Sequence, residues 1–158
     1  MEPVTGNAIT LVDVLVLRGS GAGLECLVLR RAAGGRCPGS WEMVHGHVET
    51  GEPPTDAALR ELREETGLAP VAMYNLSRVE SFYLHRREAV TLVTMFAAFV
   101  EGSAAVLLSP EHDDSAWMPA EQAKRRFAWP REVRCLEDAV HLIGTGGAGA
   151  LEDVLRVC

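Results

Sequence analysis

Three glutamates in one short segment constrain this chain more than any other feature. Glu61, Glu64 and Glu65 fall at spacings of three and four residues, which bring side chains together on one helix surface. The surrounding segment has apolar residues at helical spacing, a proline at an allowed first position and Gly67 placed to end the helix. The sequence therefore predicts a helix over 54–66 with three carboxylates directed at one point.

These carboxylates favour a bound cation. Like charges this close repel and raise one another's pKa unless a cation lies between them. Ligand sets made only of oxygen atoms suit hard cations, Mg²⁺ or Mn²⁺, better than zinc. Arg60 precedes Glu64 by four residues, so it can pair with that carboxylate and orient it. A solvated charged surface is the common alternative for such a run.

The glutamates belong to a longer pattern. The segment Gly46–Leu68 matches every fixed position of G-x5-E-x7-R-E-U-x-E-E-x-G-U, where U is aliphatic. The chain thus resembles the Nudix hydrolase family, in which this box forms a loop, helix and loop on an α/β/α sandwich. The resemblance implies divalent ions that bridge a substrate diphosphate. The implied metal ligands are Glu61, Glu64, Glu65 and the backbone carbonyl of His45. It also implies four catalytic residues, namely Glu52, Arg60, Glu64 and Glu111, in which Glu52 orients Arg60.

Two stretches outside the box extend the resemblance, and one residue at its start departs from it. Leu29–Ala33 looks like a stretch of MutT-type pyrophosphohydrolases whose second arginine contacts phosphate, which implies that Arg31 binds substrate. Glu111–Trp117 looks like the E-H-x4-W pattern of dihydroneopterin triphosphate pyrophosphatases and asymmetric diadenosine tetraphosphate hydrolases, where the glutamate is a metal ligand or general base. Many members carry Pro-Gly-Gly or Pro-Lys-Gly where this chain has His45 before the glycine. Trp41 is a candidate for stacking on a base, although an anchor in the core is the commoner role.

The rest of the chain mixes strand-like and helical runs without a regular βα alternation. Apolar patterning predicts strands at 8–18, 24–31, 41–44, 71–84, 89–100 and 104–108, and further helices at 119–127 and 131–143. We therefore expect an α+β fold with a mixed, largely antiparallel sheet in one domain spanning 1–158. The glycine-rich run 144–149 predicts a flexible joint that could free the final segment to pack on a partner subunit.

Charge and composition exclude several classes of protein. The net charge of −7 argues against binding duplex nucleic acid or an anionic membrane through a broad positive field, so an anionic ligand needs a metal or a local arginine cluster. No apolar run approaches the roughly 20 residues of a membrane span, and Glu2 and Pro3 stand where a signal peptide carries positive charge. The four cysteines show no metal or disulfide spacing. We expect a cytoplasmic protein.

The leading hypothesis is a Mg²⁺-dependent pyrophosphohydrolase that acts on a nucleoside or pterin triphosphate and releases pyrophosphate, with Mn²⁺ able to substitute. The partner would be a small molecule with a nucleoside diphosphate linkage. One alternative is a dinucleoside polyphosphate hydrolase, and another is a nucleotide-binding module without turnover. Cleavage of RNA caps or ADP-ribose stays open, as does the homodimer that is frequent in the family.

Overall fold

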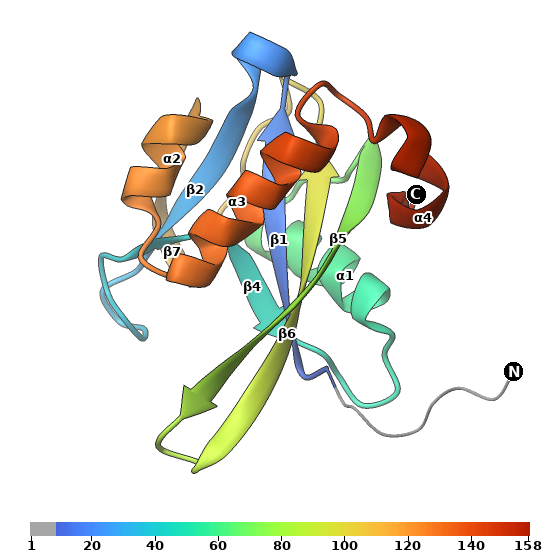
Figure 1. The fold of residues 1–158 in the computed structure, drawn as a ribbon. Coiled ribbons are helices and arrows are strands. Elements are labelled where there is room, and N and C mark those ends of the chain that lie inside the picture. The colour runs from blue at the N-terminus through green and yellow to red at the C-terminus, as the bar shows by residue number, and fades with distance from the viewer. Residues whose placement is uncertain (1–8) are drawn as a thin grey trace, which may run out of the picture.

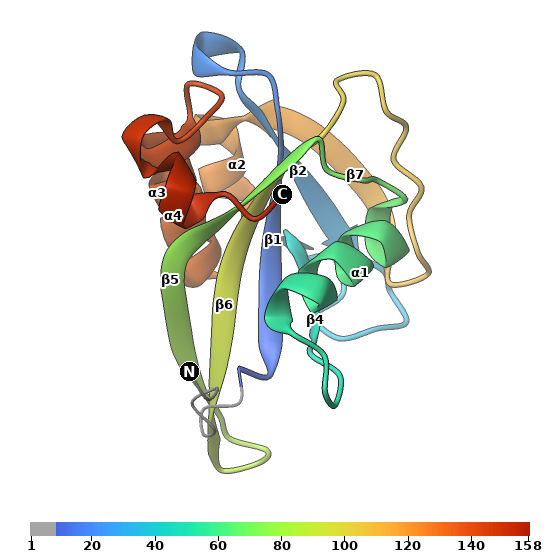
Figure 2. The same ribbon diagram turned by 90° about the vertical axis from the view of Figure 1, so that its right-hand side faces the viewer.

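The computed structural model describes residues 9–158 and contains one seven-stranded sheet with helices on both faces (Figures 1 and 2). The strands are β1 (Leu11–Arg18), β2 (Glu25–Arg31), β3 (Trp41–Glu42), β4 (Val44–His47), β5 (Ala72–Leu84), β6 (Ala89–Phe99) and β7 (His112–Pro119). The helices are α1 (Pro54–Thr66), α2 (Ala120–Arg126), α3 (Pro130–Ile143) and α4 (Glu152–Leu155), with short 3₁₀ turns η1 (Gly21–Gly23) and η2 (Gly149–Leu151).

The sheet is mixed and largely antiparallel, as the sequence predicts. Its order is β3-β2-β1-β6-β5, with β4 also paired to β1 and β7 to β2. Only the β1–β6 ladder among these pairs is parallel. Helix α1 covers one face and helices α2 and α3 cover the other (Figure 2). This is the expected α+β sandwich.

Strand β1 divides the core into two parts, because successive side chains of a strand point to opposite faces. Leu15 belongs to the apolar cluster that contains Leu136 of α3, whereas Val14 belongs to the cluster that contains Leu62 of α1. Asp13 interrupts this row and is fully buried. Its alternation with Val14 places its carboxylate on the face that α3 covers.

Helix α1 begins and ends where the sequence predicts. Gly67 has a φ of 70°, a left-handed conformation that favours glycine, and its N–H donates to the carbonyl of Arg63. The buried face of the helix consists of Ala57, Ala58, Leu62 and Thr66, together with the carboxyl-bearing Glu65. The helix therefore packs on the sheet through one face and carries the box carboxylates along the border of that face.

Two predictions about the middle of the chain are wrong. Residues 104–108 form no strand, because their apolar side chains cover the α1 side of the core while the Leu107 N–H donates to the Thr66 carbonyl at the end of α1. The structure also has strand β7, in a range where the sequence predicts no strand, and this strand pairs along most of β2. Strand β7 and the loop before it both contribute residues to the candidate site.

The final segment packs on its own sheet. The N–H of Val157 donates to the carbonyl of Met73 at 2.7 Å, and the Met73 N–H donates to the carbonyl of Cys158 at 2.9 Å. The hydroxyl of Tyr74 also donates to Glu152, at 2.9 Å. The run 144–149 thus leads back to β5 (Figure 1).

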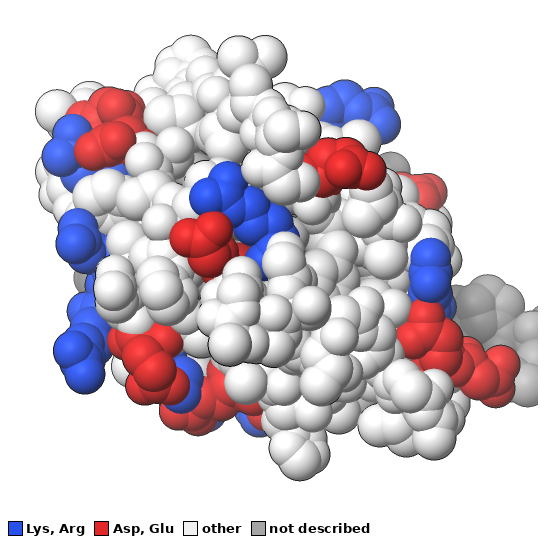
Figure 3. Space-filling view, turned by 90° about the horizontal axis from the view of Figure 1, so that it is seen from above, with Lys and Arg blue, Asp and Glu red and all other residues white. Residues whose placement is uncertain are grey.

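Several expectations concern other parts of the chain. Ala8, with which the first predicted strand begins, and the Glu2-Pro3 pair lie outside the described residues. Within the described part of the chain, no helix is long and apolar enough to cross a membrane. The end of the molecule that carries η1 shows separated groups of acidic and basic side chains with no continuous basic patch (Figure 3).

Candidate active site

Arg60 connects α1 to the segment that precedes it. Its Nε and Nη2 donate to the two carboxylate oxygens of Glu52 at 2.8 and 2.9 Å, and Nη2 also donates to the carbonyl of His47 at 2.9 Å. Its Nη1 donates to Glu61 at 2.8 Å and to Glu64 at 3.3 Å. The hydrogen bond from Arg60 is the largest of the effects that lower the pKa of Glu52 to about 2. Arg60 therefore fixes the loop and two of the helix carboxylates in one arrangement.

Four carboxylates meet at one small cavity. This cavity of about 280 Å³ is lined by Glu61, Glu64, Glu65, Ser109, Pro110 and Glu111. Glu65 is 3% exposed, and burial, followed by the charges of Glu111 and Glu61, raises its pKa to about 10. The nearest hydrogen-bond donor to its carboxylate is the backbone N–H of His45, at 3.4 Å. The loop before β7 thus brings Glu111 to the helix carboxylates.

The chemistry of this donor set fits a divalent cation. In residues 9–158 no three His, Cys, Asp or Glu side chains are gathered in ligand geometry, and the guanidinium of Arg60 contacts Glu61 and Glu64. Yet a nearly buried carboxylate that faces other carboxylates and one weak N–H donor is costly without a positive charge. A cation among these oxygens would offset the burial and the carboxylate repulsion that together raise the pKa of Glu65.

A larger cavity adjoins the carboxylates. It has a volume of about 710 Å³, and Glu61 and Glu111 line both cavities. Five arginines also line it, namely Arg31, Arg36, Arg86, Arg87 and Arg131. Arginine suits phosphate because its planar guanidinium presents several donors in a fixed fork. An acidic protein therefore concentrates positive charge in the cavity next to its carboxylate cluster.

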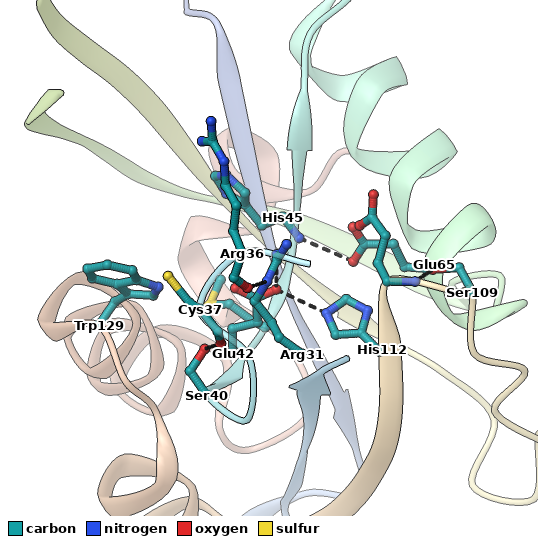
Figure 4. Close-up of polar contacts among 12 residues, drawn as sticks. Arg31, Arg36, Cys37, Ser40, Glu42, His45, Glu65, Ser109, His112 and Trp129 are labelled. Atoms are coloured by element: carbon teal, nitrogen blue, oxygen red, sulfur yellow. Dashed lines mark hydrogen bonds and ion pairs between the residues drawn. The ribbon is translucent and has the colours of Figure 1, made fainter. Parts of the chain in front are cut away.

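Arg31 is held in this cavity by the buried Glu42 and by a carbonyl of the exposed loop before β3. Its Nη1 donates to Glu42 at 2.9 Å, and its Nε donates to the carbonyl of Arg36 at 2.5 Å (Figure 4). The same oxygen of Glu42 lies 3.0 Å from Nε2 of His112, the residue after Glu111. Burial alone would raise the pKa of Glu42, but His112 and Arg31 lower it overall. The orientation of Arg31 is thereby coupled to the loop that carries Glu111.

A second buried carboxylate serves the same cavity. Asp13 accepts hydrogen bonds from Nδ1 of His45 at 2.5 Å and from Nε of Arg131 at 2.7 Å. Burial would raise the pKa of Asp13, yet the bonds and charges of these two partners lower it. Sequence reasoning missed both Asp13 and Arg131. The available signal was a lone charged residue in the middle of an apolar run, Leu-Val-Asp-Val-Leu.

Trp41 is the one candidate that the structure places elsewhere. It does not line either cavity, and it packs against the core between the guanidinium groups of Arg30 and Arg126, whose carbons lie 5.8 and 4.9 Å from its ring centroid. Its pairing with Arg30 in the β2–β3 ladder directs it there. Trp41 therefore does not stack on a ligand in the large cavity, and the aromatic side chains that line this cavity are Phe82, Tyr83 and Trp129.

Comparisons with known proteins agree with this architecture. A family model described as NUDIX domain matches residues 10–139. An octanoyltransferase of Myxococcus xanthus is 36% identical over 118 residues, which are 73% of this chain but only 32% of that protein. Nucleoside triphosphatase NudI of Klebsiella pneumoniae (strain 342) is 32% identical over 94 residues, which are 55% of this chain and 67% of that protein.

The fold is also found among solved structures. A binary complex of the Ap4A hydrolase of C. elegans has a TM-score of 0.70 at 21% identity, covering 85% of this chain and 96% of that one. At this level of identity the likeness concerns the fold alone. The family model, in contrast, covers most of the chain, and the box residues that define its signature lie together in the structure. The chain belongs to the Nudix family, as a MutT-like member.

Proposed function

We propose that the protein hydrolyses a diphosphate linkage in a nucleoside or pterin triphosphate and releases pyrophosphate, in a reaction that requires Mg²⁺ or Mn²⁺. One observation carries the proposal: four carboxylates line a cavity that adjoins a larger one lined by five arginines. This pair of cavities suits a polyphosphate whose reacting end lies at the carboxylates. The relative named as a nucleoside triphosphatase supports the same class of reaction.

Each group at the site has a role in this proposal. The metal would be held by Glu61, Glu64, Glu65 and the carbonyl of His45. A bound divalent ion neutralises phosphate oxygens and lowers the pKa of its bound water. Arg60, oriented by Glu52, keeps Glu61 and Glu64 directed at the cavity. Arg31, held by Glu42, donates to a phosphate oxygen, and Glu111 is the candidate general base.

A dinucleoside polyphosphate is the second candidate substrate. The large cavity continues beyond Arg31 to Arg36, Arg86 and Arg87, the last two in the turn between β5 and β6. These side chains would suit the additional phosphates of a longer polyphosphate, beyond the two that would lie at the carboxylates. Hydrolysis of such a substrate would yield two nucleotides in place of a nucleotide and pyrophosphate.

The test is turnover by the purified chain in Mg²⁺ and in Mn²⁺. The panel contains the common nucleoside triphosphates, dihydroneopterin triphosphate, diadenosine tetraphosphate and ADP-ribose, with products identified. Loss of partners that only orient metal ligands costs about 10- to 100-fold, so Glu64→Gln should cost at least about 100-fold. Glu137→Gln is the matched control, because Glu137 is 54% exposed where Glu64 is 57% exposed.

The products decide between the candidates. Release of pyrophosphate supports the leading proposal, and formation of two nucleotide products supports the second. If no substrate turns over with either metal, or if Glu64→Gln keeps full activity, catalysis at this site is refuted and a binding module without turnover replaces it.

A further inference from the structure

His112 lies beside the large cavity without lining it. Its side chain has no exposed surface, and its Nδ1 is the one buried side-chain nitrogen or oxygen in residues 9–158 that lacks a hydrogen-bond partner. The contact of Nε2 with Oε1 of Glu42, at 3.0 Å, is therefore the only polar contact that positions the imidazole within that part of the chain (Figure 4). An ionised carboxylate can only accept, so Nε2 carries the hydrogen of this bond whether or not the ring is charged.

Glu42 is held by two donors at a single oxygen. Its Oε1 accepts from Nε2 of His112 and from Nη1 of Arg31, and its Oε2 forms no hydrogen bond within the described residues. Arg31 lies on β2, between β3, which carries Glu42, and β7, which begins at His112. A buried carboxylate is unfavourable unless its partners compensate it. Loss of the bond from His112 would leave Glu42 with one donor, and the paired side chains of Glu42 and Arg31 could then turn together.

Arg31 has two of its three nitrogen atoms engaged inside the protein. Nε donates to the carbonyl of Arg36, and Nη1 donates to Glu42. Nη2 has no partner in the part of the chain that the structure describes, and it is not among the buried atoms that lack one, so it is accessible from the cavity that Arg31 lines. A guanidinium held at two nitrogens has a fixed direction for the third, which lowers the entropic cost of binding an anion there.

We propose that His112 and Glu42 are positioning residues for phosphate binding: the N–H of His112 fixes Glu42, and Glu42 fixes Arg31 with Nη2 directed at a substrate phosphate. The inference rests on the proposed function, in which Arg31 donates to that phosphate. His112 would then set the affinity for phosphate without contacting it. Coupling between two sites is reciprocal, so a phosphate held by Arg31 would also stabilise the start of β7, directly after Glu111.

The test is calorimetric titration of the full chain in Mg²⁺ with methylenediphosphonate, whose P–C–P bridge resists hydrolysis. Arg31→Gln should weaken binding at least about tenfold, because it removes a charge-assisted hydrogen bond. His112→Asn should weaken binding at least about fivefold by itself, but by less than about twofold in the Arg31→Gln background. Losses that fail to add in this way identify side chains that act through one another.

His112→Gln is the matched control. The amide nitrogen of glutamine can take the place of Nε2 and donate to Glu42, whereas the amide nitrogen of asparagine ends one bond short of it. Binding by His112→Gln should therefore stay within about twofold of that by the unmodified protein. If His112→Asn fails to fold, as judged by circular dichroism, Glu42→Gln takes its place in the cycle, because it keeps the shape of the side chain and removes the charge that holds both donors. The same nonadditive loss is then expected.

Four results would overturn the inference: no measurable binding of methylenediphosphonate, no loss in His112→Asn, equal losses with and without Arg31→Gln, or the same loss in His112→Gln as in His112→Asn. Binding requires no turnover, so inactivity in the hydrolysis panel refutes the proposed reaction and leaves the binding cycle to be decided by itself. Equal losses in both backgrounds, in a protein that turns over its substrate, would refute the inference alone.

Discussion

The close approach of Gly46 to Glu61 allows activity to be separated from folding. A Cβ atom at position 46 would overlap the carboxylate and Cγ of Glu61. These atoms form the end of a flexible side chain, so Glu61 can turn away while β4 keeps its place. The lost contact between Arg60 and Glu61 is worth at most about 1 kcal/mol. Alanine regains about 0.5–1 kcal/mol over glycine in a strand, so the free energy of unfolding should change by less than about 1 kcal/mol.

The effect of Gly46→Ala on catalysis should be far larger. It displaces a proposed metal ligand, so kcat/KM should fall at least about 100-fold. Urea denaturation and the hydrolysis assay, run on the same preparation, measure the two effects. Gly23→Ala is the control, because its Cβ would meet nothing within 4 Å and both quantities should stay unchanged. Full activity of Gly46→Ala would refute the placement of Glu61, and a loss of stability above about 2 kcal/mol would refute the claim that only Glu61 moves.

Two further predictions concern the fold. Leu62→Ala should lower the free energy of unfolding by about 2–5 kcal/mol, because Leu62 has no exposed surface, whereas Leu107→Ala, at a side chain 68% exposed, should cost less than about 0.5 kcal/mol. Equal losses in urea denaturation would contradict the packing of α1. Burial, followed by the charge of Asp13, raises the pKa of Glu132 well above 4.5. The folded state then holds a proton that the unfolded state releases, so stability should fall as pH rises above about 4.5. The free energy of unfolding of Glu132→Gln should lack this part of the pH dependence. An unchanged pH dependence in the variant would contradict the prediction.

Local patterns in the sequence predict the box well. Helix α1 and its carboxylates follow from spacings of three and four residues, from Pro54 and from Gly67, all within one short segment. The strand at 104–108 fails because its apolar residues suit any segment that covers a core. In the structure they cover it as an irregular chain whose Leu107 N–H bonds to the end of a helix. Strand β7 was missed because His112, Asp113 and Asp114 are unusual in strands.

Contacts between distant segments could not be predicted from the sequence. Glu42 and His112 are 70 positions apart, and Asp13 and Arg131 are 118 apart. Neither pair shares a helix or a turn that could bring it together by spacing. The first pair depends on the register of β3 and β7 along β2, and the second depends on the packing of α3 against the sheet. The carboxylate end of the site was therefore predictable from one segment, whereas the cavity wall that Asp13 and Arg131 form requires the whole fold.

The dependence of Asp13 on Arg131 bears on how the chain acquires its structure during synthesis. The ribosome makes β1 before α3, so Asp13 in the central strand lacks Arg131 until α3 has emerged. Contacts of such long sequence separation slow folding, because the loop must close before the contact forms. Fragments that stop before Arg131 should consequently remain unfolded on the ribosome. Collapse of this sheet becomes a late, cooperative event in which the helix that completes the cavity wall also completes the core.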